Sequence, residues 1–513
     1  MELYNEDDLF EDAEDDNEEP DGVADASEEQ AGDVMAENSD DEMEMGEDDD
    51  EDDDDEEDDD GEAGQEEVGD AEEPEDSAPI DIPTLKAPTE EIEVTATKFR
   101  DRYPVKPDQS LLDAKVYDVV PTMAFVHGCS VFSMDASWGG KWFFTGGEDG
   151  FIRRYNLADT VNGKQTLTVG QRHAFSDSVT KAGVLTSYFE NEQPLPKLEY
   201  KPDAENNYMP KLSPVFSLAV QSEALWLCSG LQSGGISIVS TRYGEGNIIA
   251  YLDGHKNTVS ELRLSGQETH LLSGSWDKTV KYWDLEGGKV VHTYSNMNGQ
   301  VSTIAWQPVG GPLLQPDDDK SMGSLFGSDE EPAEEAGNNE ETTTAKENTG
   351  SSFLSTTMTG HVDVWDTRST SVCLQTAGST APPWCMSACW SVDGKLIYAG
   401  RRNSTVEEYD VRKASTPVRS LKFPQISGAV TCVLAMPNGR GLMCASSDNV
   451  RLYDLQASDK RTPFVLVPGY HGSLIGRMYL DPSGRYLITA SGGRGWLESG
   501  GDVVLGYEIS RES

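Results

Sequence analysis

Residues 254–284, GHKNTVSELRLSGQETHLLSGSWDKTVKYWD, are the stretch from which the fold of this chain can be read. Apolar residues between Val259 and Leu264 predict a first strand, and Ser265-Gly266 predicts a turn. Leu271 to Ser273 begin a second strand, and the alternation of Val280 and Tyr282 predicts a third. Short strands joined by tight turns indicate an all-β unit.

The two ends of this stretch carry a recognisable pattern, because a Gly-His pair opens it and a Trp-Asp pair closes it. This pattern resembles the WD repeat, in which four short strands form one blade of a β-propeller. The resemblance implies that four side chains form a hydrogen-bonded set: His255, Ser273, Asp277 and Trp283. Because buried polar groups need partners, we expect these residues to stabilise the blade and to have no part in chemistry.

The closing pair recurs along the chain, at Tyr155-Asn156, Val239-Ser240, Trp283-Asp284, Trp365-Asp366, Tyr409-Asp410, Tyr453-Asp454 and Tyr507-Glu508. The spacings between successive pairs are 84, 44, 82, 44, 44 and 54 residues. Three of them equal one repeat of about 40–45 residues, and the others equal one repeat plus an insertion. The spacing therefore predicts a seven-bladed WD-repeat β-propeller over residues 109–513, with insertions at about 158–210, 310–350 and 491–501.

Closure of the ring needs a further strand, because the last repeat ends close to the last residue of the sequence. Val116–Val120 precedes the first repeat and reads as a short strand. We expect this strand to complete the last blade, which would join the two ends of the domain and leave no long open sheet edge.

The three insertions differ in composition. Residues 158–210 are apolar enough to pack against the propeller or a partner, whereas 310–350 are acidic, with one apolar pair at Leu325-Phe326, and are expected to be disordered. Residues 491–501 read as a glycine-rich hairpin that presents Trp496.

The formal charge of -55 is concentrated at one end of the chain. Residues 1–80 hold 43 of the 94 acidic residues, and no Lys or Arg occurs before Lys86. Such a segment cannot bury enough apolar surface to offset its ordering entropy, so residues 1–108 are predicted to be an acidic disordered tail followed by a Pro-containing linker. The charge favours basic partners and argues against direct DNA binding, which needs clustered Lys and Arg to neutralise phosphates.

No arrangement of residues points to catalysis, a cofactor or a metal. Cys385 and Cys389 have no second pair and no nearby His, and no Gly-rich phosphate loop or G-x-S-x-G turn occurs. The seven cysteines are scattered and odd in number, which is typical of reduced thiols in the cytosol or nucleus. Because neither a signal peptide nor a bilayer-spanning apolar run occurs, we expect a soluble, non-enzymatic protein without a membrane partner.

The acidic tail can be interpreted in two ways. It can act through solubility and self-repulsion alone. Alternatively, the apolar pairs Leu3-Tyr4 and Leu9-Phe10 can insert into a groove that otherwise holds bent DNA, such as that of the TATA-binding protein. Leu325-Phe326, which precedes a further acidic run, is a second candidate for such a contact.

Beyond the generic repeat, four stretches resemble the WD-repeat subunits of the SAGA transcriptional co-activator, a family associated with the TATA-binding protein. They are FTGGEDGFIRRYN (144–156), NGKQTLTVGQRHAFSDSVTKAGVLTSYFENEQP (162–194), LSPVFSLAVQSEALWLCSGLQSGGIS (212–237) and SGSWDKTVKYWDL (273–285). The resemblance implies a nuclear scaffold subunit that binds other SAGA subunits and the TATA-binding protein, and that regulates its delivery to promoters. A histone-binding or histone-chaperone WD-repeat protein is the alternative, since an acidic tail fits it equally well. An enzyme, or a substrate adaptor of a ligase, is a third class without a supporting motif.

Overall fold

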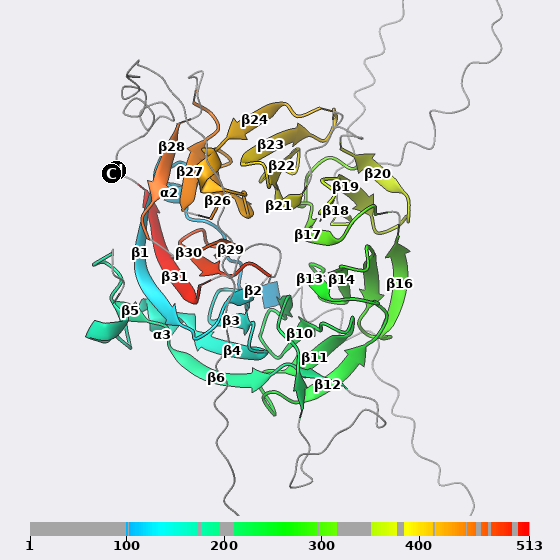
Figure 1. Ribbon diagram of the computed structural model, residues 1–513, viewed down its shortest axis with the longest axis horizontal. Coiled ribbons are helices and arrows are strands. Elements are labelled where there is room, and N and C mark those ends of the chain that lie inside the picture. The colour runs from blue at the N-terminus through cyan, green and yellow to red at the C-terminus, as the bar shows by residue number, and fades with distance from the viewer. Residues whose placement is uncertain are drawn as a thin grey trace, which may run out of the picture. The chain divides into compact units, whose positions relative to one another are not determined.

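The computed structural model describes residues 99–511 apart from eleven gaps. The gaps are 101, 173–175, 195–209, 296, 315–349, 377–383, 414–415, 448, 458–462, 470–472 and 495–500. Within these limits the fold is an all-β propeller of seven blades arranged around a central channel (Figure 1). The prediction of seven blades is confirmed.

The first four blades each contain four antiparallel strands, which follow one another from the channel to the rim. Blade 1 contains β2 (Val131–Ala136), β3 (Trp142–Gly147), β4 (Phe151–Asn156) and β6 (Leu185–Glu190). Blade 2 contains β9 (Leu218–Val220), β10 (Trp226–Gly230), β11 (Ile236–Ser240) and β12 (Ile248–Leu252). Blade 3 contains β13 (Val259–Leu264), β14 (His270–Ser275), β15 (Val280–Asp284) and β16 (Lys289–Tyr294). Blade 4 contains β17 (Val301–Trp306), β18 (Ser352–Thr357), β19 (Val362–Asp366) and β20 (Val372–Gln375).

The last three blades follow the same order. Blade 5 contains β21 (Cys385–Trp390), β22 (Leu396–Arg401), β23 (Thr405–Asp410) and β24 (Arg419–Lys422). Blade 6 contains β25 (Cys432–Ala435), β26 (Gly441–Ala445), β27 (Val450–Asp454) and β28 (Phe464–Val467). Blade 7 contains β29 (Ile475–Leu480), β30 (Tyr486–Ser491), β31 (Val503–Arg511) and β1 (Tyr117–Val126), with the short β5 (Lys181–Ala182) beside β1.

The few remaining elements are short. They are α2 (Gln109–Leu112), α3 (Leu157–Val161), the 3-10 turns η2 (Val169–Gln171) and η3 (Gln425–Ser427), and the strand pair β7 (Glu192–Gln193) and β8 (Lys211–Leu212).

The stretch that predicts the fold forms three strands of blade 3, and the predicted strands and turn are confirmed. The turn between β14 and β15 is made by its own residues. The Asp277 carboxylate accepts a hydrogen bond from the Thr279 N–H at 3.0 Å, and Lys278 takes a φ of 69°. A short polar side chain that binds the backbone two residues on is the usual way to make such a reversal.

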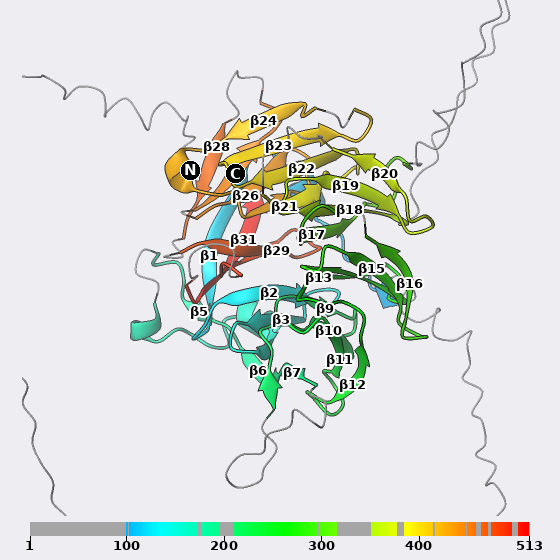
Figure 2. The same cartoon turned by 45° about the vertical axis from the view of Figure 1, so that its right-hand side comes forward.

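The ring is closed by the first and last strands of the domain, as the sequence predicts. β1 pairs antiparallel with β31 from Tyr117 opposite Arg511 to Val126 opposite Val503. Figures 1 and 2 both show these two strands, blue and red, side by side. Phe125 of β1 is buried and packs with Phe143 and Tyr155 of blade 1, at ring-centroid distances of 5.3 and 5.1 Å. The strand that closes the ring therefore also fills the core between blades 7 and 1.

The segment 158–210 is only partly an insertion, because β6 within it is the outer strand of blade 1. The spacing could not reveal this, since the extra residues lie between the third and fourth strands of the blade. Leu167, Val179 and Val184 of this segment are buried, and β5 pairs in parallel with β1. The segment therefore packs against blades 7 and 1.

Residues 99–113 form an N-terminal strap along one face of the ring. The Trp138 indole N–H donates to the Tyr103 carbonyl at 2.8 Å, and Arg485 is 2.8 Å from Asp108. Leu111 at the end of the strap is buried, and its carbonyl accepts a hydrogen bond from the Tyr117 hydroxyl. The strap therefore ties the chain before β1 to blades 1 and 7.

Candidate functional site

The four side chains expected to form a hydrogen-bonded set lie together in blade 3. His255 Nδ1 is 2.9 Å from Asp277 Oδ2, and His255 Nε2 is 2.7 Å from Ser273 Oγ. The Trp283 indole N–H donates to the same Ser273 oxygen at 2.7 Å. Burial raises the pKa of Asp277, but hydrogen bonds from His255, Thr279 and the backbone outweigh it and hold that pKa well below its usual range. His255, Ser273 and Trp283 are buried, and Asp277 lies in the adjoining turn, so the set spends its polar groups on contacts within the blade.

Blade 4 keeps part of this set, and blade 5 replaces it. In blade 4 the Trp365 indole N–H donates to Ser355 Oγ at 2.8 Å, as in blade 3. In blade 5 the buried Arg401 binds the Glu407 carboxylate and the Tyr409 hydroxyl, at 2.8 and 3.0 Å. A charged pair with a phenol thus replaces the histidine and indole there. In each of these blades the contacts join buried side chains of the same blade, so they stabilise that blade.

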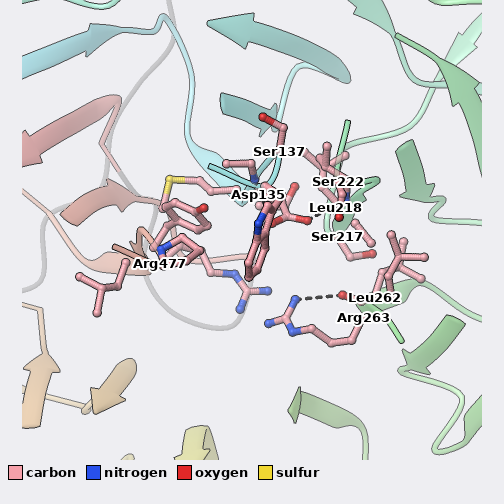
Figure 3. Close-up of a pocket in the computed structure, with 18 of the residues that line it drawn as sticks. Asp135, Ser137, Ser217, Leu218, Ser222, Leu262, Arg263 and Arg477 are labelled. Atoms are coloured by element: carbon pink, nitrogen blue, oxygen red, sulfur yellow. Dashed lines mark hydrogen bonds between the residues drawn. The ribbon is translucent and has the colours of Figure 1, made fainter. Parts of the chain in front are cut away.

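A cavity of about 370 Å³ lies at the end of the central channel, where the inner strands β2, β9, β13 and β29 end in turns (Figure 3). Its charged lining residues are Arg100, Asp135, Glu261, Arg263 and Arg477. Charged side chains are rarely buried unless they are paired, so the partners of these residues decide what the cavity can do.

Three arginines converge on the fully buried carboxylate of Glu261. Arg477 Nη2 lies 2.5 Å and Arg494 Nη2 lies 3.1 Å from Glu261 Oε1, while Arg263 Nη2 lies 3.2 Å from Oε2. Arg494 and Arg477 also donate to the Phe132 carbonyl, at 3.3 and 3.1 Å. One carboxylate therefore holds three guanidinium groups near the channel axis.

Backbone irregularity explains why Glu261 and Arg477 face the channel. The ladder between β13 and β14 shifts register between Val259 and Glu261, and that between β29 and β30 shifts between Ile475 and Arg477. A β-bulge re-aims the side chain that follows it. Glu261 and Arg477 each follow such a shift, and both side chains line the cavity.

Arg494 reaches the channel from beside the start of β29. It follows β30, whose last residue, Ser491, pairs with Ile475 at the start of β29. The side chain is buried, and its Nη2 also lies 3.4 Å from the Phe216 carbonyl. Arg494 belongs to the glycine-rich segment 491–501, which the sequence predicts as a hairpin presenting Trp496. No sequence signal marked Arg494, because its partners come from three other blades.

Arg100 of the N-terminal strap completes the wall of the cavity. Its guanidinium lies 2.8 Å from Glu268 Oε1, donates to Ser222 Oγ at 2.8 Å, and stacks 5.0 Å from the Trp138 ring centroid. Figure 1 shows the first described residues, in blue, near the middle of the ring. Arg100 thus fixes the strap at the cavity.

Asp135 is the second acid that lines the cavity. Burial raises the pKa of Asp135 to about 6, although hydrogen bonds from the N–H groups of Val220 and Ala136 oppose this. The charges of Arg263 and Arg100 also favour its ionised form. Its oxygens are therefore already occupied by donors from blades 1 and 2.

The outer strands of blades 1, 2 and 3 expose large apolar side chains, and we call this the outer apolar face. Its residues are Leu185 and Tyr188 of β6, Ile249 and Tyr251 of β12, and Val290 and Val291 of β16. Tyr188 is 66% exposed and Ile249 is 60% exposed. Exposed apolar side chains gathered on neighbouring elements mark interaction surfaces more often than single ones do.

Several predicted contact residues lie outside the described part of the chain: Leu3, Tyr4, Leu9, Phe10, Leu325, Phe326 and Trp496. All seven cysteines are described and none is in a disulfide; five are buried. Among the described residues no group of three or more His, Cys, Asp or Glu could hold a metal ion. In the same part of the chain, no helix has the length and apolarity needed to cross a membrane.

The chain is similar to known proteins over most of its length. The family model described as SPT8 beta propeller matches residues 117–510. SAGA complex subunit SPT8 of Saccharomyces cerevisiae is 40% identical over 445 residues, which cover 78% of this chain and 73% of that protein. SAGA complex subunit Spt8 of Schizosaccharomyces pombe is 40% identical over 440 residues, covering 78% of this chain and 81% of that protein. Pre-mRNA-processing factor 19 homolog 2 of Arabidopsis thaliana is 23% identical over 266 residues, 51% of this chain and 41% of that protein.

Proposed function

Because the chain belongs to the SPT8 β-propeller family of SAGA complex subunits, we propose that it is a non-enzymatic nuclear scaffold that binds the TATA-binding protein and regulates its delivery to promoters. The observation that carries the proposal is 40% identity to two SAGA subunits over 73% and 81% of their lengths. A propeller suits this role because its rigid blades offer two faces and a rim to different partners.

The outer apolar face is the surface that we assign to docking within the co-activator. Leu185 and Tyr188 lie on β6, inside the segment 158–210 that the sequence indicates as apolar enough to meet a partner. Outer strands also leave backbone N–H and C=O groups available for pairing with another chain. Other subunits of the complex are the expected partners for this face.

The acidic tail is the segment that we assign to the TATA-binding protein. Its charge suits a protein surface built to bind DNA, and Leu3-Tyr4 and Leu9-Phe10 can replace the apolar contacts of an unstacked base step. Leu325-Phe326 and Trp496 are secondary candidates for the same partner. In this mechanism the tail and promoter DNA compete for one surface, so a promoter releases the TATA-binding protein from the subunit.

A pull-down of the TATA-binding protein tests this proposal. The baits are the full chain, residues 88–513, and a full chain with Leu3, Tyr4, Leu9 and Phe10 changed to Ala. The truncated chain keeps the strap, because Tyr103 and Asp108 contact the propeller. We expect the truncation and the four substitutions to weaken binding at least about tenfold, since four anchoring side chains or the whole tail are removed.

The matched control changes Val34, Met35, Met43 and Met45 to Ala, which removes four apolar residues from equally acidic sequence. This control should bind as the unchanged chain does. Equal binding by all baits would move the contact to the propeller, and additive binding of TATA-box DNA would refute competition. Retention of core histones without the TATA-binding protein would favour the histone-binding alternative.

A further inference from the structure

Glu268 lies at a turn position where four of the other six blades have glycine. The turn joins the first two strands of a blade, and the N–H of this residue closes it by donating to the carbonyl three residues before. Glu268 takes a φ of 62° there. The corresponding residues of blades 1, 5, 6 and 7 are glycines with φ between 64° and 73°: Gly140, Gly394, Gly439 and Gly484. Because a Cβ is crowded in this left-handed region, the backbone favours glycine where the sequence has a glutamate.

The Glu268 side chain is buried against the neighbouring blade. It is 3% exposed, and its carboxylate accepts hydrogen bonds from the Ser222 N–H at 2.8 Å, the Ser222 hydroxyl and the Gln221 amide at 3.1 Å. These donors belong to the corresponding turn of blade 2. They are neutral, whereas a buried carboxylate is costly unless it is also paired with a cation. Arg100 of the strap is that cation, with Nη2 2.8 Å from Glu268 Oε1.

Three side chains contact the Arg100 guanidinium, each by a different interaction. Glu268 forms the ion pair, Ser222 Oγ accepts a hydrogen bond from Nε at 2.8 Å, and the Trp138 ring centroid lies 5.0 Å from the guanidinium carbon. A planar guanidinium suits this combination of acceptors and aromatic face better than the compact ammonium of lysine. Glu268, Ser222 and Trp138, which we call the arginine site, come from turns of blades 3, 2 and 1.

The propeller holds the arginine site together without the strap. The Trp138 N–H donates to the Ser222 carbonyl at 2.9 Å, and the Ser222 N–H donates to Glu268 at 2.8 Å. These bonds link the three turns to one another. The site is therefore built by the blades, and Arg100 is its occupant.

The strap is weakly attached around Arg100. Among the described residues, the hydrogen bonds between residues 99–106 and the propeller are those of Arg100 and of the Tyr103 carbonyl. Tyr103 is 56% exposed, and a cavity of about 660 Å³ is lined both by the middle of the strap and by blades 1 and 7. The buried Leu111 lies at the other end of the strap. Because segments with few buried contacts open at low cost, residues 99–106 can leave the propeller while Leu111 stays in place.

We propose that Glu268, Ser222 and Trp138 form a binding site for an arginine side chain, which Arg100 fills within the chain and which an arginine of a basic partner segment fills in its place. A basic partner is favoured because the site contains a carboxylate and the chain has a formal charge of -55. Binding of the partner then releases residues 99–106 from the propeller. The site lies apart from the outer apolar face, and it does not depend on the contact proposed above between the tail and the TATA-binding protein.

Titration calorimetry with peptides copied from the strap tests the site. The probe is a capped peptide of residues 98–104, KFRDRYP. Two further peptides carry citrulline, which is neutral and similar in shape to arginine, in place of Arg100 or of Arg102. Their net charges are equal, so attraction to the acidic tail is the same for both. We expect loss of the Arg100 guanidinium to weaken binding at least about tenfold more than loss of the Arg102 guanidinium, because only the former removes charge-assisted hydrogen bonds to Glu268.

The full chain with Arg100→Ala is the titrated protein, because this change leaves the site without its own arginine. In the unchanged chain the tethered Arg100 competes at an effective concentration on the order of 1 mM, so the probe should bind at least about tenfold more weakly. Arg102→Ala is the matched control, since it removes the same charge from an exposed position of the strap. It should bind the probe as the unchanged chain does.

A second substitution locates the bound peptide. Glu268→Gly, added to Arg100→Ala, removes the carboxylate and gives the turn the residue that four other blades have, so the fold should be retained. Binding of the probe should weaken about tenfold or more. Thermal unfolding of each variant checks the fold.

Hydrogen exchange of the unchanged chain tests displacement of the strap. The Tyr103 N–H donates to the Phe99 carbonyl at 2.9 Å, so its exchange reports on residues 99–106. Saturating probe should speed this exchange to about the rate found in Arg100→Ala, and should leave exchange of the blade strands unchanged. Because this measurement needs no variant of the site, it holds even where a variant fails to fold.

Equal affinity of the two citrulline peptides would overturn the proposal. Equal binding of the probe by Arg100→Ala and Arg102→Ala would do the same. Binding unaffected by Glu268→Gly would place the peptide on the acidic tail instead of the arginine site. Unchanged exchange of the Tyr103 N–H at saturation would refute displacement of the strap.

Discussion

At the scale of single residues, His127 shows how burial sets the behaviour of a titratable group in this propeller. Its Nε2 lies 3.2 Å from the Tyr155 hydroxyl, and burial, reinforced by the charge of Arg153, lowers the pKa of His127 to about 3. The ring is therefore neutral in the folded protein at any pH above that value. In the unfolded chain an ordinary histidine takes up a proton near pH 6.5.

This difference predicts a loss of stability in mild acid. Below pH about 6.5 the unfolded state binds a proton that the folded state does not, so stability falls as the pH is lowered, by about 2 kcal/mol between pH 6.5 and 5. His127→Gln removes this titration and keeps a polar partner for Tyr155. The melting temperature of the unchanged chain should therefore fall more steeply from pH 7 to 5 than that of the variant. If the melting temperatures of the two chains fell in parallel with pH, His127 would not be the source of the acid sensitivity, since all other titratable groups are common to both chains.

At the scale of elements, β1 closes the ring, because it completes the last blade with a strand from the start of the domain. Its residues alternate between buried and partly exposed positions from Tyr117 to Phe125, as expected for a strand with one face in the core. Pro121 lies at a register shift in the pairing with β31, where the regular ladder is interrupted. The strand could be located from sequence because ring closure required it.

Phe125→Ala tests how much this closing strand stabilises the ring. Removing a buried ring that packs on Phe143 and Tyr155 leaves a cavity and should lower the free energy of unfolding by about 3–5 kcal/mol. Val126→Ala is the control, because Val126 is the next residue of the same strand and is 55% exposed. Denaturant unfolding followed by tryptophan fluorescence measures both. A similar midpoint for the two variants would show that β1 does not hold the ring closed.

At the scale of the whole molecule, the Glu261 cluster connects blades that are distant in sequence. Glu261 comes from blade 3, and Arg477 and Arg494 come from blade 7. The arginines in turn bind the carbonyls of Phe132 in blade 1 and Phe216 before blade 2. One buried carboxylate thus ties four neighbouring blades together at the channel.

Glu261→Gln should therefore destabilise the entire ring. Removing one member of a buried ion cluster leaves uncompensated charge and costs about 3–5 kcal/mol. Glu286→Gln, at an exposed position of the same blade, makes the same change of charge and should leave the melting temperature nearly unchanged. Differential scanning calorimetry measures both. Equal melting temperatures would show that the arginines are satisfied without Glu261.

The number of blades and the strand that closes the ring could be predicted from the chain alone. The number of blades follows from the regular spacing of the closing pairs. The closing strand follows because the last blade of a closed ring must be completed by a strand from elsewhere in the chain. The hydrogen-bonded set around His255 followed from the likeness of residues 254–284 to a known repeat, because its members keep fixed positions within one blade. The family resemblance likewise depends on unbroken stretches such as residues 273–285.

The cluster of charged side chains around Glu261 could be identified only from the tertiary structure. Glu261, Arg263, Arg477 and Arg494 are spread over more than 200 residues, and each lies next to ordinary strand or turn sequence. Bulges in β13 and β29 turn two of these side chains inward, and closure of the ring brings the distant blades to a common axis. The same holds for β6, which lies beyond a long insertion and is identified as the outer strand of blade 1 only by its pairing with β4. Contacts of this kind join residues that do not recur at a regular interval in the sequence. Sequence periodicity therefore could not predict them.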